Sequence, residues 1–183
     1  LMTHSAALPD LYTYNCSDDL TEHWSSRTLQ PWAPPGTFYN YSNEGWSLAG
    51  RIAEVITGLD FDDLVQELVL EPSLMETATF DPSEAMDNSP YAIGYDNGYF
   101  YTPENNDCAY TDPAGGLHAT VLDLARTMEM HIADGGDLLS IGSVMEMRSQ
   151  MESGYPWTSE VGLGQFTYEH KGIEYLSHSG AGV

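Results

Sequence analysis

Residues 41–58 read YSNEGWSLAGRIAEVITG, and they place a short polar turn directly before a helix-forming run. Ser42 or Asn43 can cap the N-terminus of that helix, and Gly58 can close its C-terminus. Between these caps, apolar residues recur at helical spacing: Ala49, Ile52, Ala53 and Ile56. The stretch therefore predicts a helix of about three turns that follows from Tyr41-Ser42-Asn43.

Further helices and one hairpin are expected beyond this stretch. Helical spacing recurs in two places: before Pro72, where the apolar face is Phe61, Leu64, Val65 and Leu68, and over residues 120–134 before Gly135-Gly136. In the second of these, Thr120 and Asp123 resemble a capping box with Asp in place of Glu. A shorter helix is expected over residues 141–148. Only residues 161–178 change to the two-residue period of strands, interrupted by Glu169-His170-Lys171-Gly172, and they predict a β-hairpin.

The order of these elements predicts an α+β fold with two parts. Residues 1–160 would form a mainly helical subdomain, and residues 161–183 a hairpin of an antiparallel sheet. Because the chain ends directly after a strand-like stretch, we expect that sheet to be incomplete in this chain and its uncovered edge to permit self-association. Residues 31–36 and 91–113 are expected to be loops.

The charge of the chain excludes several classes of partner. It has 28 Asp and Glu against 5 Lys and Arg among 183 residues, which gives a formal net charge of −23 at pH 7. Nucleic acids and anionic membrane surfaces need clustered basic residues, and Lys171 is the only lysine. No apolar run approaches the ~20 residues that cross a bilayer. Because the acids are spread along the chain, they favour a surface adapted to concentrated salt over an acidic face for a cationic partner.

Cys16 and Cys108 are the only cysteines. They can form one disulfide in an exported protein or remain two buried thiols in a cytoplasmic one, and their count does not separate these alternatives. The sequence has no CxxC or HExxH motif, so we expect no metal or other cofactor.

Three short stretches hold residues that can carry chemistry. Tyr41-Ser42-Asn43 puts a phenol at a helix N-terminus, where the helix dipole favours an anionic base, although an ordinary cap with a packed tyrosine is the simpler alternative. His178-Ser179-Gly180 ends the last strand, where glycine lets a substrate backbone lie close, or where the histidine is merely exposed. Pro113-Ala114-Gly115-Gly116 is a tight loop before a helix, or a turn with no further role.

Six motifs occur in order along the chain. They are residues 1–10 (LMTHSAALPD), 35–45 (PGTFYNYSNEG), 71–77 (EPSLMET), 113–117 with 123–126 (PAGGL and DLAR), 162–164 (GLG) and 178–180 (HSG). Together they resemble the serine β-lactamase and penicillin-binding-protein superfamily, in its branch of class C β-lactamases and D-alanyl-D-alanine carboxypeptidases. Each motif alone is weak, but six in the right order are a specific signal.

The resemblance implies a role for three residues of these motifs. Tyr41 would be the general acid/base that moves protons between nucleophile, leaving group and water. Asn43 would bind the substrate amide or a nearby lysine. His178, which stands where many members have lysine, would supply a positive or hydrogen-bonding edge toward the substrate carboxylate.

The resemblance also implies a β-lactamase/transpeptidase-like fold in which residues 1–160 hold the active-site loops. Ser179 and Gly180 would flank the substrate near the oxyanion site. Gly115 and Gly116 would form part of the site wall. Members of this family are typically exported, so the resemblance suggests a periplasmic or extracellular protein.

The nucleophile is the main departure from the family pattern. The family acylates a serine in an S-x-x-K motif, and none occurs here, because Lys171 is the only lysine and Tyr168 stands three residues before it. In the family the motif precedes the stretch that matches residues 1–10. We therefore expect the serine to lie outside this chain, and the chain alone to be inactive.

These observations together predict a segment of a salt-adapted serine hydrolase that acts by acyl transfer on β-lactams, D-Ala-D-Ala peptides or esters. One alternative is a non-catalytic ligand-binding protein on the same scaffold. An S-x-x-K motif upstream of Leu1 would favour the enzyme, and its absence the binding protein. A second alternative is an acidic module for a basic partner, which would gather the acids on one face.

The net charge gives the first testable prediction. Molar NaCl or KCl should raise the melting temperature of the chain, because it shortens the range of charge repulsion from ~10 Å at 0.1 M salt to ~3 Å at 1 M. A thermal melt followed by circular dichroism at both salt concentrations measures this. A melting temperature that stays flat or falls would contradict salt adaptation.

Overall fold

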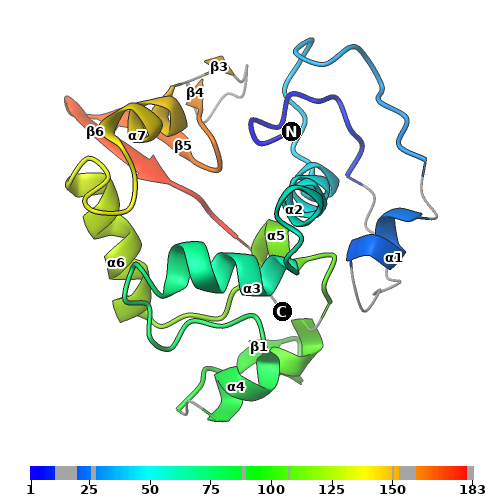
Figure 1. The fold of residues 1–183 in the computed structure, drawn as a ribbon, viewed down its shortest axis with the longest axis vertical. Helices are drawn as coiled ribbons and strands as arrows, with labels where there is room; N and C mark the ends of the chain where they lie inside the picture. The colour runs from blue at the N-terminus through cyan, green and yellow to red at the C-terminus, as the bar shows by residue number, and fades with distance from the viewer. Residues whose placement is uncertain are drawn as a thin grey trace.

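A computed structural model of the chain describes residues 1–10, 20–25, 28–87, 90–106, 108–149, 151–152 and 160–180. Its helices are α1 (Leu20–Ser25), α2 (Asn43–Thr57), α3 (Phe61–Val65), the π-helical η1 (Gln66–Leu70), α4 (Pro82–Asp87), the 3-10 helix η2 (Pro103–Asn106), α5 (Asp112–Gly115), α6 (Val121–Ile132) and α7 (Ile141–Arg148). Its strands are β1 (Gly94–Asp96), β2 (Tyr99–Tyr101), β3 (Met151–Glu152), β4 (Glu160–Val161), β5 (Phe166–His170) and β6 (Ile173–Ser177). Figure 1 shows α2 and α3 near the middle and the larger sheet beside α7. The predicted α+β class is confirmed.

Helix α2 forms as predicted from residues 41–58. Ser42 is its N-cap, and the Ser42 hydroxyl accepts the backbone N–H of Gly45 at 3.1 Å. Gly58 follows the last helical residue with a φ of 77°, and its N–H donates to the Glu54 carbonyl at 2.7 Å. Glycine suits this left-handed position because it has no Cβ.

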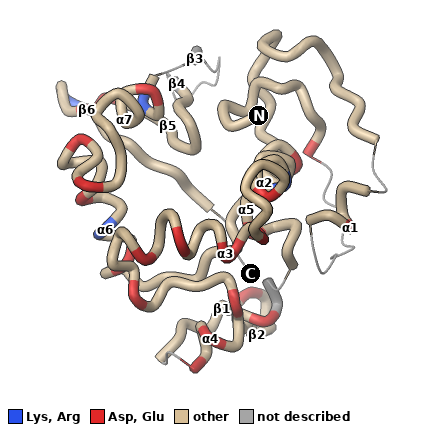
Figure 2. Tube along the Cα trace, in the orientation of Figure 1, with Lys and Arg blue, Asp and Glu red and all other residues tan. Residues whose placement is uncertain are grey.

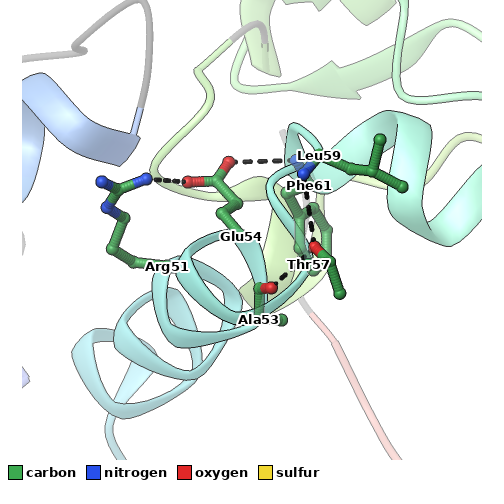
Figure 3. A network of polar contacts seen from close by, with 6 residues as sticks. All are labelled: Arg51, Ala53, Glu54, Thr57, Leu59 and Phe61. Carbon is green, nitrogen blue, oxygen red and sulfur yellow. Dashed lines mark hydrogen bonds and ion pairs between the residues drawn. The ribbon is translucent and has the colours of Figure 1, made fainter.

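One carboxylate holds the joint between α2 and α3 (Figure 3). Glu54 Oε2 lies 2.9 Å from Nη1 of Arg51 on α2, while Glu54 Oε1 accepts the backbone N–H of Phe61 at 3.0 Å. Phe61 is the first residue of α3, so this bond satisfies an N–H group that has no partner inside the helix. The end of α2 thereby fixes the start of α3.

The second predicted helix begins at Phe61 but changes its period. Beyond α3 it continues as the π-helix η1, in which each turn takes an additional residue. This change turns Leu70 inward, with 1% of its surface exposed, and leaves Leu68 59% exposed. The predicted apolar face is therefore wrong at Leu68, and Leu70 takes the buried position.

A small buried cluster follows η1. It is formed by Leu70, Met75 and Ala78, with Val65 and Leu117 packed against it. Burial of these apolar side chains removes them from water and stabilises the junction between η1 and the segment after α5.

Helix α5 approaches α2 through a glycine. A Cβ on Gly50 would lie 2.4 Å from Cγ of Pro113, so only glycine allows this close contact. A two-residue antiparallel bridge between Thr79 and His118, with N–H to carbonyl distances of 2.9 and 2.8 Å, ties the segment after α5 back to the chain after η1. The PAGG loop is therefore placed by packing against the middle of α2.

The predicted hairpin belongs to a four-stranded antiparallel sheet with the order β3-β4-β5-β6. Lys171 and Gly172 connect β5 to β6 with φ values of 54° and 76°, as in a two-residue hairpin turn. The sequence predicts only two strands of this sheet, whereas the structure adds β3 and β4 on the β5 side. Both of these strands begin before residue 161, and the division of the chain into residues 1–160 and 161–183 stays a prediction.

A second hairpin, β1 and β2, lies inside residues 91–113, where only loops are predicted. Asn97 and Gly98 form its turn with φ values of 49° and 89°, and the strands pair in register from Gly94 with Tyr101 to Asp96 with Tyr99. The loop prediction for this stretch is wrong, because three-residue strands are too short to give a clear two-residue period.

Several apolar side chains on α2 and α6 stay exposed in the described part of the chain: Ile52, Val55, Ile56, Val121, Leu122, Leu124, Met128 and Ile132. The helical spacing that predicts these helices is therefore real, but the described elements do not cover all of the apolar positions. Among the described residues, no helix combines the length and apolarity needed to span a membrane.

Acidic residues occur on most of the described elements, whereas Lys and Arg occupy a few separate points (Figure 2). On the larger hairpin, Glu169 lies directly opposite Glu174. Like charges in register repel one another across a strand pair. Acidic side chains therefore oppose folding at the contact between Glu169 and Glu174, in addition to the general repulsion that the net negative charge causes.

The two cysteines differ in what the structure describes. Cys108 is disulfide-bonded and buried, whereas Cys16 lies outside the described residues. A free thiol at Cys108, which the sequence leaves open, is thereby excluded.

The predicted capping box at the start of α6 is confirmed. The Thr120 hydroxyl accepts the N–H of Asp123 at 3.2 Å, and Asp123 Oδ2 accepts the N–H of Thr120 at 2.9 Å. The same oxygen accepts the hydroxyl of Thr77 at 2.5 Å. Burial by itself would raise the pKa of Asp123, but these hydrogen bonds hold that pKa below its usual value of 3.8.

Asp123→Asn tests the importance of this box. The variant should lower the free energy of unfolding at pH 7 by about 1.5–3 kcal/mol, because hydrogen bonds to a charged, buried group are lost. The stabilisation is present above the pKa of the unfolded chain and is lost as pH falls through the lower pKa of the folded chain. Urea unfolding at pH 7 and pH 3 measures it, with Asp137→Asn on an exposed turn as the control. Equal stability of both variants at pH 7 would contradict the prediction.

Candidate active site

The turn at Tyr41-Ser42-Asn43 lies against the first ten residues of the chain. Backbone N–H groups of residues 32–40 donate to carbonyl groups of residues 1–10: Trp32 to Ala7 at 2.9 Å, Gly36 to Ser5 at 2.7 Å and Asn40 to His4 at 2.8 Å. Two segments that are far apart in sequence therefore run side by side. Together they lead into the N-terminus of α2.

His4 forms the buried side of this turn. Its Nδ1 accepts the backbone N–H of Ser42 at 3.1 Å, and its ring stacks on that of Tyr41 with centroids 4.3 Å apart and planes 26° from parallel. The indole Nε1 of Trp46 lies 3.3 Å from Nε2 of the same imidazole. One buried side chain thus touches three residues at the start of α2.

The imidazole of His4 is neutral at physiological pH. Burial lowers the pKa of His4 from 6.5 to about 4, and the neighbouring imidazole of His178 contributes to this lowering. A neutral imidazole keeps an acceptor nitrogen, which is what the N–H of Ser42 requires. Protonation of Nδ1 would remove this bond.

Asn43 is held by Asp10. The backbone N–H of Asn43 donates to Asp10 Oδ1 at 2.9 Å, and Nδ2 of Asn43 donates to Asp10 Oδ2 at 3.2 Å. The two carboxylate oxygens therefore bind the main chain and the side chain of one residue. Asn43 is the first residue of α2, so this contact also satisfies an N–H group that lacks an intrahelical partner.

His178 enters the site from the end of β6. Its ring centroid lies 6.3 Å from that of Tyr41 and 5.1 Å from that of Phe166 on β5. Figure 1 shows the segment after β6 running from the sheet toward α5 and α2. The structure thus places His178 near Tyr41, and Asn43 follows Tyr41 two residues later at the start of α2. The roles that the resemblance implies for these three residues stay predictions.

The loop at residues 162–164 joins the sheet to the other side of the site. The backbone N–H of Gly164 lies 3.4 Å from the Met2 carbonyl, and a Cβ on Gly164 would lie 3.1 Å from Cη2 of Trp46. Gly164 also has a φ of 72°. Both the close approach to Trp46 and the left-handed backbone favour glycine at this position.

A buried pair of titratable groups lies on another side of α2. His23 Nε2 on α1 is 3.7 Å from Glu44 Oε2 in the first turn of α2, and both side chains are almost fully buried. The His23 ring stacks on Tyr110 at 4.3 Å. This pair anchors α1 to the same helix end that carries Tyr41 and Asn43.

The other predicted site residues are less closely connected to this group. Ser179 and Gly180 directly follow His178 and are exposed. Gly115 ends α5 and Gly116 follows it, and a Cβ on Gly116 would lie 2.1 Å from Asp112 Oδ1. That contact explains why glycine stands at position 116, while the assignment of all four residues to the substrate site stays a prediction.

His4 and Asp10 contact the candidate site residues directly, and the sequence analysis does not identify either of them. They are the only titratable side chains in the motif at residues 1–10, and that fact was a usable signal. The sequence does not reveal the partners of these two side chains, because His4 contacts Ser42 and Asp10 contacts Asn43, which lie 38 and 33 residues further along the chain. Among the described residues, no group of three or more His, Cys, Asp and Glu side chains could hold a metal ion.

Known proteins that resemble the chain in sequence belong to the superfamily that its motifs indicate. A family model described as beta-lactamase matches residues 1–183. The chain is 27% identical over 162 residues to penicillin-binding protein 4 of Amycolatopsis lactamdurans, a match that covers 81% of this chain and 42% of that protein. It is 28% identical over 152 residues to a D-aminopeptidase of Cereibacter sphaeroides, covering 81% and 28%. The chain thus spans less than half the length of these curated relatives.

Solved structures with the same fold include an octameric penicillin-binding protein homologue from Pyrococcus abyssi. That match has a TM-score of 0.83 and 24% identity, and it covers 98% of this chain and 45% of the other. D-amino acid amidase from Ochrobactrum anthropi SV3, complexed with D-phenylalanine, matches with a TM-score of 0.67 and 17% identity over 97% and 56%. These likenesses confirm the predicted β-lactamase-like and penicillin-binding-protein-like fold.

The neutral state of His4 gives a prediction for pH. His4→Asn keeps an acceptor oxygen near the place of Nδ1 but does not titrate. Because the pKa of His4 is about 4 in the folded chain and 6.5 otherwise, the unfolded chain binds more protons between these values. The wild-type chain should therefore lose stability relative to the variant as pH falls from 6.5 to 4, by at most ~1.4 kcal/mol per pH unit. Melting temperatures of both proteins, measured in molar salt at several pH values from 6.5 to 4, test this. An equal change of melting temperature with pH in both proteins would contradict the prediction.

Proposed function

The chain belongs to the beta-lactamase family, and we propose that it supplies the general acid/base part of the active site of a serine hydrolase that acts by acyl transfer. The observation that carries this proposal is the position of Tyr41, which stacks on neutral His4 at 4.3 Å and lies 6.3 Å from the ring of His178. The penicillin-binding-protein and D-aminopeptidase relatives support the assignment.

In this proposal the nucleophile is the serine of an S-x-x-K motif outside these 183 residues. Its oxygen attacks the acyl carbon while its proton passes to the phenolate oxygen of Tyr41, and Tyr41 then protonates the leaving nitrogen or oxygen. In the second step Tyr41 takes a proton from the attacking water, and the serine regains its proton as the acyl group leaves. The positive end of the α2 dipole is suited to stabilise negative charge in this region.

The remaining site residues bind and orient the substrate in this proposal. Asn43 hydrogen-bonds the substrate amide or the lysine of the S-x-x-K motif. His178 supplies a hydrogen-bonding edge beside Tyr41, with Ser179 and Gly180 alongside the acyl group. Gly115 and Gly116 contribute to the wall of the pocket.

The substrates we propose are compounds with a transferable acyl group: β-lactams, D-Ala-D-Ala peptides, related D-amino acid amides, or esters. Amide bonds next to D-amino acids are favoured, since one relative is a D-aminopeptidase and one protein of similar fold is a D-amino acid amidase. We further propose that the parent protein works in concentrated salt. The net charge of −23 and the facing pair of Glu169 and Glu174 support this.

A non-catalytic binding protein on the same scaffold is the second candidate. It is favoured by one observation, the absence of an S-x-x-K motif from the sequence. Such a protein would keep the arrangement of Tyr41 and His178 for ligand binding and lose hydrolysis. Reading the sequence that adjoins residues 1–183 in the parent gene separates the two candidates.

Tyr41→Phe tests the proposed reaction in a protein that joins this chain to its S-x-x-K segment. The variant keeps the ring that stacks on His4 but loses the hydroxyl, so kcat/KM for a chromogenic cephalosporin or a D-amino acid p-nitroanilide should fall about 10²- to 10⁴-fold. Tyr175→Phe is the matched control, because both tyrosines are 37% exposed and Tyr175 lies on the hairpin. Turnover by Tyr41→Phe at the parent rate would show that Tyr41 is not the base.

A further inference from the structure

We propose that Asp10 is a positioning residue for the active site: its carboxylate sets the orientation of the Asn43 side-chain amide, so that the amide oxygen of Asn43 is turned away from Asp10 and toward its reaction partner. The inference rests on the proposed function for what that partner is. The orientation itself rests on the contacts between Asp10 and Asn43.

The first step concerns the chemistry of the two groups. An ionised carboxylate only accepts hydrogen bonds, whereas a carboxamide has a donor end and an acceptor end. Asp10 Oδ2 lies 3.2 Å from Asn43 Nδ2, and the opposite orientation of the amide would bring two acceptor oxygens together. Asp10 therefore selects one of the two possible orientations of the Asn43 amide.

The second step concerns the main chain. Asp10 Oδ1 also accepts the backbone N–H of Asn43 at 2.9 Å, so the carboxylate grips the residue at two points. Its negative charge lies at the positive end of the α2 dipole, where it is favoured. A two-point contact fixes the side-chain torsion of Asn43 as well as the orientation of its amide.

The third step concerns the support of Asp10 itself. The preceding Leu8 and Pro9 are buried, the Leu8 carbonyl accepts Nδ2 of Asn40 at 2.5 Å, and the Pro9 carbonyl lies 3.3 Å from the hydroxyl of Ser42. The backbone just before Asp10 is thus bonded to the residues just before Asn43. The carboxylate is held in place by contacts on the same turn that it organises.

The consequence is a defined set of groups that Asn43 can offer to a reaction partner. One hydrogen of Nδ2 is used by Asp10, which leaves the oxygen Oδ1 as an acceptor and the second Nδ2 hydrogen as a donor. An acceptor at this position suits an ammonium group or an amide N–H. The substitution Asp10→Asn removes the selection, because the new carboxamide offers a donor and an acceptor to either end of the Asn43 amide.

The orientation is tested by NMR on the 183-residue chain. In Asp10→Asn the backbone N–H and the Nδ2 hydrogens of Asn43 should exchange with solvent about 10- to 100-fold faster, as for a lost hydrogen bond to a charged group. Asp137→Asn, which removes the same charge from an exposed turn, should leave both unchanged. Unchanged exchange at Asn43 in Asp10→Asn would overturn the proposal.

A second measurement needs no variant. In the wild-type chain at pH 7 a scalar coupling across the hydrogen bond should connect Nδ2 of Asn43 to the carboxyl carbon of Asp10, because the two groups lie within hydrogen-bond distance. Absence of this coupling, with the Asn43 side-chain amide assigned, would overturn the proposal even if Asp10→Asn failed to fold.

The role in catalysis is tested in the protein that includes the S-x-x-K segment. Asp10→Asn should lower kcat/KM by about 10- to 100-fold, as expected for a misplaced active-site group, and chiefly through kcat. Combining it with Asn43→Ala should give no further loss. Wild-type turnover by Asp10→Asn alongside an impaired Asn43→Ala would overturn the positioning role. Failure of the proposed reaction would show instead as full activity of Tyr41→Phe.

Discussion

The N-terminus of a helix carries N–H groups that cannot bond within the helix, and this constraint organises the molecule around α2. Ser42 takes the N–H of Gly45, Asp10 takes the N–H of Asn43, and His4 takes the N–H of Ser42 one residue earlier. Two of these three acceptors come from the first ten residues. The helix end that carries the candidate active site is therefore completed by a distant part of the chain.

The elements that sequence reasoning predicted correctly are those whose signals are local. Residues 41–58 contain both caps of α2. The capping box of Thr120 and Asp123 begins α6, and a turn with glycine joins β5 to β6. Each of these signals acts over a few residues, so no tertiary information is needed to read it. The same locality explains the error at Leu68, since a change to π-helical bonding leaves no mark in apolar spacing.

The sequence predicts only part of the candidate site, because the remaining part depends on contacts between distant segments. Tyr41, Asn43 and His178 are identified by motif order, but the residues that hold two of them are found only through contacts across 33 to 38 positions. No sequence spacing predicts that His4 stacks on Tyr41 or that Asp10 binds Asn43. The additional strands β3 and β4 were missed likewise, because two-residue strands exist only through their pairing.

The turn of the larger hairpin has a practical consequence. Lys171 is the only lysine side chain in the sequence, and it is exposed at the tip between β5 and β6, at the far end of β6 from His178. An amine-reactive fluorophore would therefore have a single side-chain attachment point in these 183 residues, in the turn before the strand that leads to His178. The scarcity of basic residues thus turns the hairpin into a chemically unique reporter position.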